Sequence, residues 1–121
     1  MQSNTIKSYK DLVVWKKSYD LVKRVYEITR KLPKEEVFGL SSQMQRSAVS
    51  IPSNIAEGFS RKSQKEFAQF LHISFGSVAE LETQLMLCQD IFNVSVKNEI
   101  ELLTEVSKML RGLLSSLKTN N

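Results

Sequence analysis

Few side chains in this 121-residue sequence could act together in catalysis. The single histidine, His72, and the single cysteine, Cys88, fall in one predicted helix, about 24 Å apart along its axis, which is beyond hydrogen-bond reach. The four glycines are isolated, and no group of His, Cys or carboxylate residues has the spacing of a zinc or diiron site. We therefore expect no catalytic site, metal or cofactor; an enzyme would need a site formed between subunits from His72, Glu57 or Cys88.

The charges are modest overall but unevenly distributed. The net charge is +4, yet residues 1–34 hold nine basic and three acidic side chains, whereas residues 66–105 hold one basic and seven acidic side chains. A surface of this kind could attract nucleic acid at one end, or it could help neighbouring copies of the chain to dock. Under the first interpretation, phosphate groups would be contacted by eight basic residues: Lys16, Lys17, Lys23, Arg24, Arg46, Arg61, Lys62 and Lys65.

Aromatic residues alternate with basic ones near the N-terminus, where Tyr9, Trp15, Tyr19 and Tyr26 stand among lysines. Such a pattern can bind single-stranded nucleic acid through stacking and charge. However, Trp15, Tyr19 and Tyr26 also recur at helical spacing on one side of a predicted helix, which is typical of core residues. We therefore expect these rings to pack inside the protein and to leave only the lysines at the surface.

Polar residues follow one side of the next predicted helix: Gln43, Arg46, Ser50, Asn54, Glu57 and Arg61. This side is either a solvated face or a hydrogen-bonded seam against a neighbouring helix, or else a recognition ridge for a partner or for phosphate. Pro52 lies in the middle of the same helix, where it removes one backbone hydrogen bond. We expect a kink there, with nearby serine side chains taking up the freed backbone group.

Apolar periodicity and capping signals predict an all-α protein with helices at about residues 9–31, 40–58, 64–92 and 96–117. Ser8, Ser63 and Ser95 are the expected caps of the first, third and fourth helices, and Pro33 ends the first. The connections between these helices are short. We therefore predict an antiparallel, up-down-up-down four-helix bundle that forms a single domain over residues 1–121.

The first helix carries apolar residues on two nearly opposite sides. We assign one stripe to the core of the bundle: Leu12, Trp15, Tyr19, Val22 and Tyr26. The second stripe, like three apolar residues of the third helix, would stay uncovered in a lone bundle, and such surface usually marks an interface. The predicted subunit interface therefore comprises Val14, Leu21, Val25, Ile28, Leu32, Ile73, Leu87 and Ile91. The alternative is a broad core face with a few exposed aliphatic side chains.

Four segments resemble one known family, in the order YKDLVVW (9–15), GLSSQM (39–44), SIPSNIAEG (50–58) and GSVAELETQL (76–85). They are similar to the four-helix bundle family of 23S rRNA intervening-sequence proteins, also called the S23 ribosomal protein family. The family motif falls on Ser50, Pro52, Asn54, Glu57 and Gly58. The resemblance implies an antiparallel bundle that assembles as a ring-shaped homopentamer. It also implies a relation to the accessory protein of diversity-generating retroelements, whose pentameric barrel binds nucleic acid and a reverse transcriptase.

The resemblance and the charge pattern together predict a non-enzymatic oligomer that binds RNA or another nucleic acid, or that associates with ribosomes. The alternative is a structural or adaptor protein that binds a protein partner through the surface of the ring. No run of 18 apolar residues is present, and residues 1–4 lack the basic start of a signal peptide. Together with the single cysteine, these features lead us to expect a cytoplasmic protein without a membrane partner.

Overall fold

The computed structural model describes residues 5–119, which contain four long helices and no strand. The helices are α1 (Val13–Thr29), α2 (Leu40–Phe59), α3 (Gln64–Phe92) and α4 (Lys97–Thr119). The prediction of an all-helical chain with four long helices is confirmed for this part. The predicted domain also includes residues 1–4, from which the absence of a signal peptide was inferred, and residues 120–121, all of which lie outside the described residues.

The first predicted helix, residues 9–31, is divided in the structure. The capping box of Ser8 and Asp11 is confirmed, because Asp11 Oδ2 accepts the backbone N–H groups of Lys7 and Ser8, each at 3.0 Å. These two backbone donors lower the pKa of the Asp11 carboxyl. The capped segment is only a short 3-10 turn, since Leu12 is extended with ψ 127° and α1 begins after it. The prediction of one continuous helix was therefore wrong at its start.

The later helix ends agree closely with the capping signals. Ser63 Oγ accepts the backbone N–H of Glu66 at 3.1 Å, so α3 begins where predicted. Asn93 follows the last residue of α3 with φ 59°, a left-handed conformation that asparagine tolerates and that stops the helix. The start of α4 lies one residue later than predicted. The carbonyl of Val96 accepts the first helical hydrogen bond at 2.9 Å, which places the cap at Val96 rather than at Ser95.

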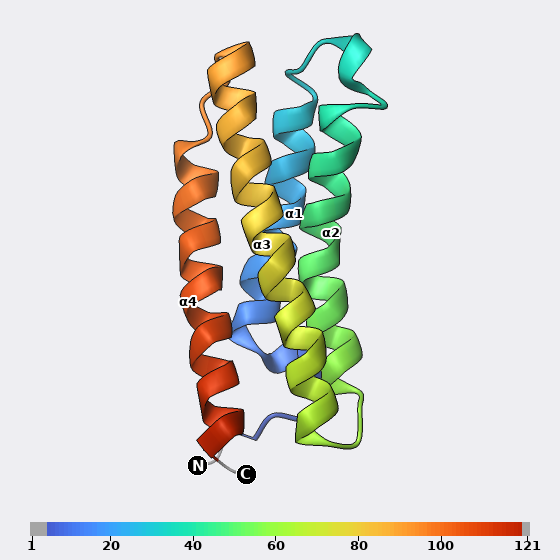
Figure 1. Cartoon of the computed structure of the whole chain (residues 1–121), viewed down its shortest axis with the longest axis vertical. Helices are drawn as coiled ribbons and strands as arrows, with labels where there is room; N and C mark the ends of the chain where they lie inside the picture. The colour runs from blue at the N-terminus through green and yellow to red at the C-terminus, as the bar shows by residue number, and fades with distance from the viewer. Residues whose placement is uncertain (1–4, 120–121) are drawn as a thin grey trace.

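Each helix packs against two others, in the order α1–α2–α3–α4 and back to α1 (Figure 1). Figure 1 places the α1–α2 and α3–α4 connections at one end of the molecule and the α2–α3 connection at the other. Buried apolar side chains from all four helices form one core, which includes Leu21, Met44, Leu81 and Leu110, each 0% exposed. The surface available for binding therefore consists of the outer sides of the helices and the grooves between neighbours.

The structure reverses the two predicted sides of α1. The stripe assigned to a subunit interface lies in the core of the single chain: Val14, Leu21, Val25, Ile28 and Leu32 are each at most 8% exposed. Tyr19 and Tyr26, which were assigned to the core, are 51% and 40% exposed. Aliphatic side chains have no polar atom to satisfy, whereas each tyrosine hydroxyl requires water or a partner, so the aliphatic side is the one that is buried. These five residues are therefore excluded as an exposed interface.

α2 and α3 approach each other closely at Gly58. A Cβ atom added at Gly58 would lie 2.7 Å from Cβ of Phe70 and 2.9 Å from Cδ1 of Phe67. The rings of Phe59 and Phe67 meet edge to face beside it, with their centroids 5.9 Å apart. Only glycine leaves room for the two helices at this distance. The last residue of the SIPSNIAEG segment is therefore a packing residue.

A chain of side-chain hydrogen bonds also joins α2 to α3. Ser50 Oγ accepts from Ser77 Oγ at 2.8 Å and from Asn54 Nδ2 at 2.9 Å. Ser74 Oγ donates to the carbonyl of Ile51 at 2.9 Å. The interpretation of the polar side of α2 as a hydrogen-bonded seam against a neighbouring helix is therefore confirmed for Ser50, whereas Asn54 is hydrogen-bonded to Ser50 of its own helix. Its other polar residues stay exposed: Gln43, Arg46, Glu57 and Arg61.

We predict that Gly58→Ala lowers the free energy of unfolding by about 1–3 kcal/mol, because the new Cβ overlaps the rigid Cβ of Phe70. Urea denaturation followed by circular dichroism measures this change. Gly76→Ala is the matched control, since Gly76 lies in α3 with no atom within 4 Å of an added Cβ. That substitution should leave the stability unchanged or raise it by up to about 1 kcal/mol. Equal effects at the two sites would contradict the close approach of α2 and α3.

A second prediction concerns the seam. Ser50→Ala should cost about 1–2 kcal/mol, because the Ser77 hydroxyl and one bond of the Asn54 amide lose their acceptor. Ser53→Ala provides the control, as Ser53 is exposed on the same helix, and it should stay within about 0.5 kcal/mol of the wild type. Thermal unfolding of the two variants tests the comparison, and a Ser50→Ala protein as stable as the control would show that the seam contributes nothing.

Candidate nucleic-acid interface

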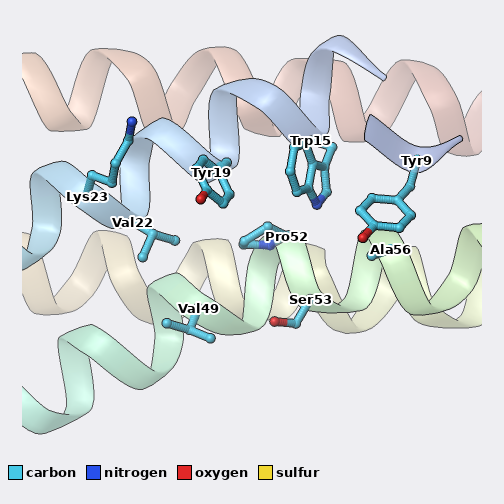
Figure 2. Close-up of a pocket in the computed structure, with 9 residues that line it drawn as sticks. All are labelled: Tyr9, Trp15, Tyr19, Val22, Lys23, Val49, Pro52, Ser53 and Ala56. Atoms are coloured by element: carbon cyan, nitrogen blue, oxygen red, sulfur yellow. The ribbon is translucent and has the colours of Figure 1, made fainter. Parts of the chain in front are cut away.

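A groove runs along the surface between α1 and α2 (Figure 2). It encloses about 380 Å³, a volume within the range of small-ligand sites. Side chains of α1 and the turn before it form one wall, and side chains of α2 form the other. Its lining comprises Tyr9, Trp15, Tyr19, Val22, Lys23, Val49, Pro52, Ser53 and Ala56. The groove thus combines three aromatic rings, a proline and a lysine in one open site.

The aromatic rings of this groove form a row along α1. Trp15 and Tyr19 stack with their centroids 4.9 Å apart and an interplanar angle of 30°. Tyr9 meets Trp15 edge to face, at 5.2 Å and 65°. The expectation that Trp15, Tyr19 and Tyr26 pack inside the protein is confirmed in part for Trp15, which is partly buried against the core, and it is wrong for Tyr19 and Tyr26, which are 51% and 40% exposed. The row therefore consists of one exposed ring, Tyr19, and two partly buried rings, Trp15 and Tyr9.

Two lysines stand beside the ends of this row. Lys23 Nζ lies 5.5 Å from the centroid of the Tyr19 ring, and Lys10 Nζ lies 6.0 Å from that of Tyr9. Both distances allow a cation–π attraction. Neither lysine forms a salt bridge with a carboxylate within residues 5–119. Their charges therefore remain available to an anion. Lys23 was among the predicted phosphate contacts and Lys10 was not, although its position next to Tyr9 in the sequence was a usable signal.

The other predicted phosphate contacts do not form one cluster, and three of them are in exposed salt bridges. Lys17 Nζ pairs with Glu105 at 3.1 Å, Arg24 with Asp20 at 2.9 Å, and Arg61 with Glu57 at 2.7 Å. Exposed pairs of this kind are weak, so a polyanion could compete for the cations. Lys16 is exposed on α1, and its charge makes a minor contribution to the lowered pKa of Asp11, after the backbone hydrogen bonds.

Arg61, Lys62 and Lys65 lie at the α2–α3 connection, at the same end of the molecule as the beginning of α1 (Figure 1). All three side chains are exposed, and the guanidinium of Arg61 lies 4.9 Å from the ring centroid of Phe70. Arg46 stands apart from them, on the outer side of α2. It lines a second hollow, which shares Val49 and Ser53 with the aromatic groove. Lys23 and Arg46 therefore line the two hollows beside α2, whereas Arg61, Lys62 and Lys65 lie at this end of the molecule.

The residues of the family motif divide between packing and surface. Ser50 and Gly58 hold α2 against α3, as described above, and Asn54 donates to Ser50 within α2. Pro52 is buried and contributes to the floor of the aromatic groove, and α2 continues through it. Glu57 is exposed and pairs with Arg61. The motif thus positions α2 between its two neighbours.

An enzyme site between subunits would need His72 or Cys88, and these two side chains differ in exposure. Cys88 is 0% exposed, and burial raises the pKa of its thiol, so it cannot contribute to a site between subunits. His72 is exposed on α3. Within residues 5–119, no three His, Cys, Asp or Glu side chains gather as a metal site requires. In the same part of the chain, no helix combines the length and apolar character needed to cross a membrane.

α3 exposes apolar side chains on its outer surface. Ile73, Leu87 and Ile91, the three predicted interface residues of this helix, are 51%, 43% and 63% exposed. Met86 is 54% exposed and leads into a hollow of about 520 Å³ between α3 and α4. The hollow also contains Ile100, and three acidic residues and one lysine line it: Glu82, Asp90, Glu101 and Lys97. α3 therefore offers apolar contact area next to negative charge, in contrast to the groove on α1.

This architecture is similar to that of known proteins. The family model for the 23S rRNA-intervening sequence protein matches residues 10–114. Among solved structures, the chain is similar to a protein of unknown function from the S23 ribosomal protein family of Bacteroides thetaiotaomicron VPI-5482, with a TM-score of 0.78 and 26% identity over 84% of this chain and 98% of that one. No curated protein matches the sequence. Since the family model spans most of its length, the chain belongs to the family of 23S rRNA-intervening sequence proteins.

Proposed function

We propose that this protein is a non-enzymatic RNA-binding protein that acts as a ring of identical subunits. The observation that carries the proposal is a set of surface basic side chains that form no salt bridge within residues 5–119, among them Lys10 beside the partly buried ring of Tyr9 and Lys23 beside the exposed ring of Tyr19. Lys62 and Lys65 add exposed charge at the α2–α3 connection. The family name supplies the class of nucleic acid, since it refers to segments of 23S ribosomal RNA.

Self-association is supported by the exposed apolar side chains of α3. Ile73, Leu87 and Ile91 are 51%, 43% and 63% exposed, and Leu87 and Ile91 lie one helical turn apart on α3. Neighbouring exposed apolar side chains of this kind favour an interface. Contacts between two different patches generate closed rings when the rotation between subunits closes. The copy number of five rests on the family resemblance. A ring of five would raise the net charge from +4 to about +20, so weak phosphate contacts would add up.

The second candidate function is that of an adaptor that binds a protein partner. The hollow between α3 and α4 favours it, because Met86 and Ile100 offer apolar contact there while Glu82, Asp90 and Glu101 line the same hollow. A basic amphipathic helix would match both features. Recovery of a protein partner without RNA would favour this function over the first.

We predict that the purified wild-type protein sediments as an oligomer and that Ile91→Asp weakens the assembly at least about tenfold, because an unpaired carboxylate would be buried in the interface. Val37→Asp is the control, as Val37 is 53% exposed in the α1–α2 connection. Sedimentation velocity of the three proteins, with circular dichroism to show that they are folded, provides the measurement. A wild-type protein that sediments as a single subunit when dilute would refute self-association.

RNA binding should depend strongly on salt, because phosphate contacts release counterions. The affinity for mixed-sequence single-stranded RNA should weaken at least about tenfold between about 50 and about 200 mM salt. The double variant Lys62→Gln, Lys65→Gln should bind more weakly and with a shallower salt dependence. Its control is Lys97→Gln, Lys108→Gln, which removes the same charge from exposed positions of α4. Fluorescence anisotropy tests both variants, and absence of binding at low salt would reject the proposed function.

A further inference from the structure

We propose that the groove between α1 and α2 is the site at which bases of single-stranded RNA stack, with Trp15 and Tyr19 as the stacking surface. This inference rests on the proposed function, and it goes further by naming the site and the form of the nucleic acid. The groove holds about 380 Å³, and side chains from both helices line it (Figure 2).

The rings of the groove have the geometry of a stacking surface. Tyr9, Trp15 and Tyr19 follow one another at centroid distances of 5.2 and 4.9 Å, and Tyr19 remains half exposed. Bases of any sequence can stack on such rings, because every base has a π-face. On the opposite wall, Ser53 exposes a hydroxyl group that can donate or accept a hydrogen bond to a base edge or to a ribose 2′-OH.

Charge complementarity selects a polyanion as the occupant. Lys10 and Lys23 lie at the two ends of the ring row and form no salt bridge within residues 5–119. An apolar helix in the groove would bring no charge to match these lysines. A second copy docked through its own α1 would place like charges together, whereas phosphates between stacked bases would neutralise them.

The groove continues into a neighbouring hollow on the outer side of α2. The two sites share Val49 and Ser53, and the second one adds the ring of Tyr26, 40% exposed, and the guanidinium of Arg46. The two adjoining hollows therefore each contain an aromatic ring and a basic side chain. Two such sites in series fit a strand better than they fit a free nucleotide.

The test uses the full-length protein and the fluorescence of Trp15, which is its only tryptophan. Titration with poly(U) at low salt should quench the emission of Trp15, because a base stacks against the indole. Inorganic polyphosphate is the matched probe, since it carries the charges without bases, and it should leave the emission nearly unchanged. Equal quenching by both polymers would overturn the stacking site.

Substitutions in the groove provide an independent readout. Tyr19→Ala should bind poly(U) about tenfold more weakly, whereas Tyr19→Phe, which keeps the ring, should bind like the wild type. Phe38→Ala is the control for loss of an exposed ring, because Phe38 is 97% exposed in the α1–α2 connection. Circular dichroism verifies that each variant is folded.

The outcomes separate this inference from the proposed function. If poly(U) binds with salt-dependent affinity but neither quenches Trp15 nor responds to Tyr19→Ala, the groove is not the site, and the RNA-binding function still stands. If no RNA binds at low salt, both fail. If Tyr19→Ala dissociates the oligomer and leaves RNA affinity unchanged, the groove is a subunit contact, and the stacking site is overturned.

Discussion

The burial of one side of α1 determines which surface this protein presents. The aliphatic side, with Leu21 and Val25 both 0% exposed, packs toward α2 and α4 and completes the core. The aromatic side must then stay outside, so Trp15 and Tyr19 line a groove instead of filling the interior. Had the aromatic side been buried, only lysines would remain on the surface of α1, and a polyanion would meet charge without rings on which to stack.

α2 packs between α1 and α3, and its two sides carry different kinds of residues. Toward α3 it presents Gly58, which permits close approach, and Ser50, which accepts two hydrogen bonds. Toward α1 it presents Pro52, which forms part of the groove. The SIPSNIAEG segment (50–58) is thus mainly a packing segment. It maintains the spacing of three helices, and the proposed binding surfaces lie beside it and on the outer side of α3.

Local signals in the sequence located most helix ends because a cap depends on residues within one turn. Ser63 and Glu66 marked the start of α3, and Ser8 and Asp11 marked a real capping box. The same signals could not show that Leu12 is extended, since that conformation depends on how the preceding turn packs against the body of the protein. For the site, the basic residues could be identified one by one from the sequence, but their partners could not. The sequence could not show that Arg24 and Arg61 are engaged in salt bridges or that Lys10 flanks a ring.

By itself, the sequence determined that the chain is helical, where α3 begins and ends, and that His72 and Cys88 lie out of reach of each other, because each of these follows from spacing along a single helix. Only the tertiary structure decided which side of α1 is buried. Both sides of α1 carry apolar residues at the helical period, so periodicity cannot show which of the two sides faces the core. The buried side is decided by the space between α2 and α4, because aliphatic side chains fill it without leaving a hydroxyl group unsatisfied.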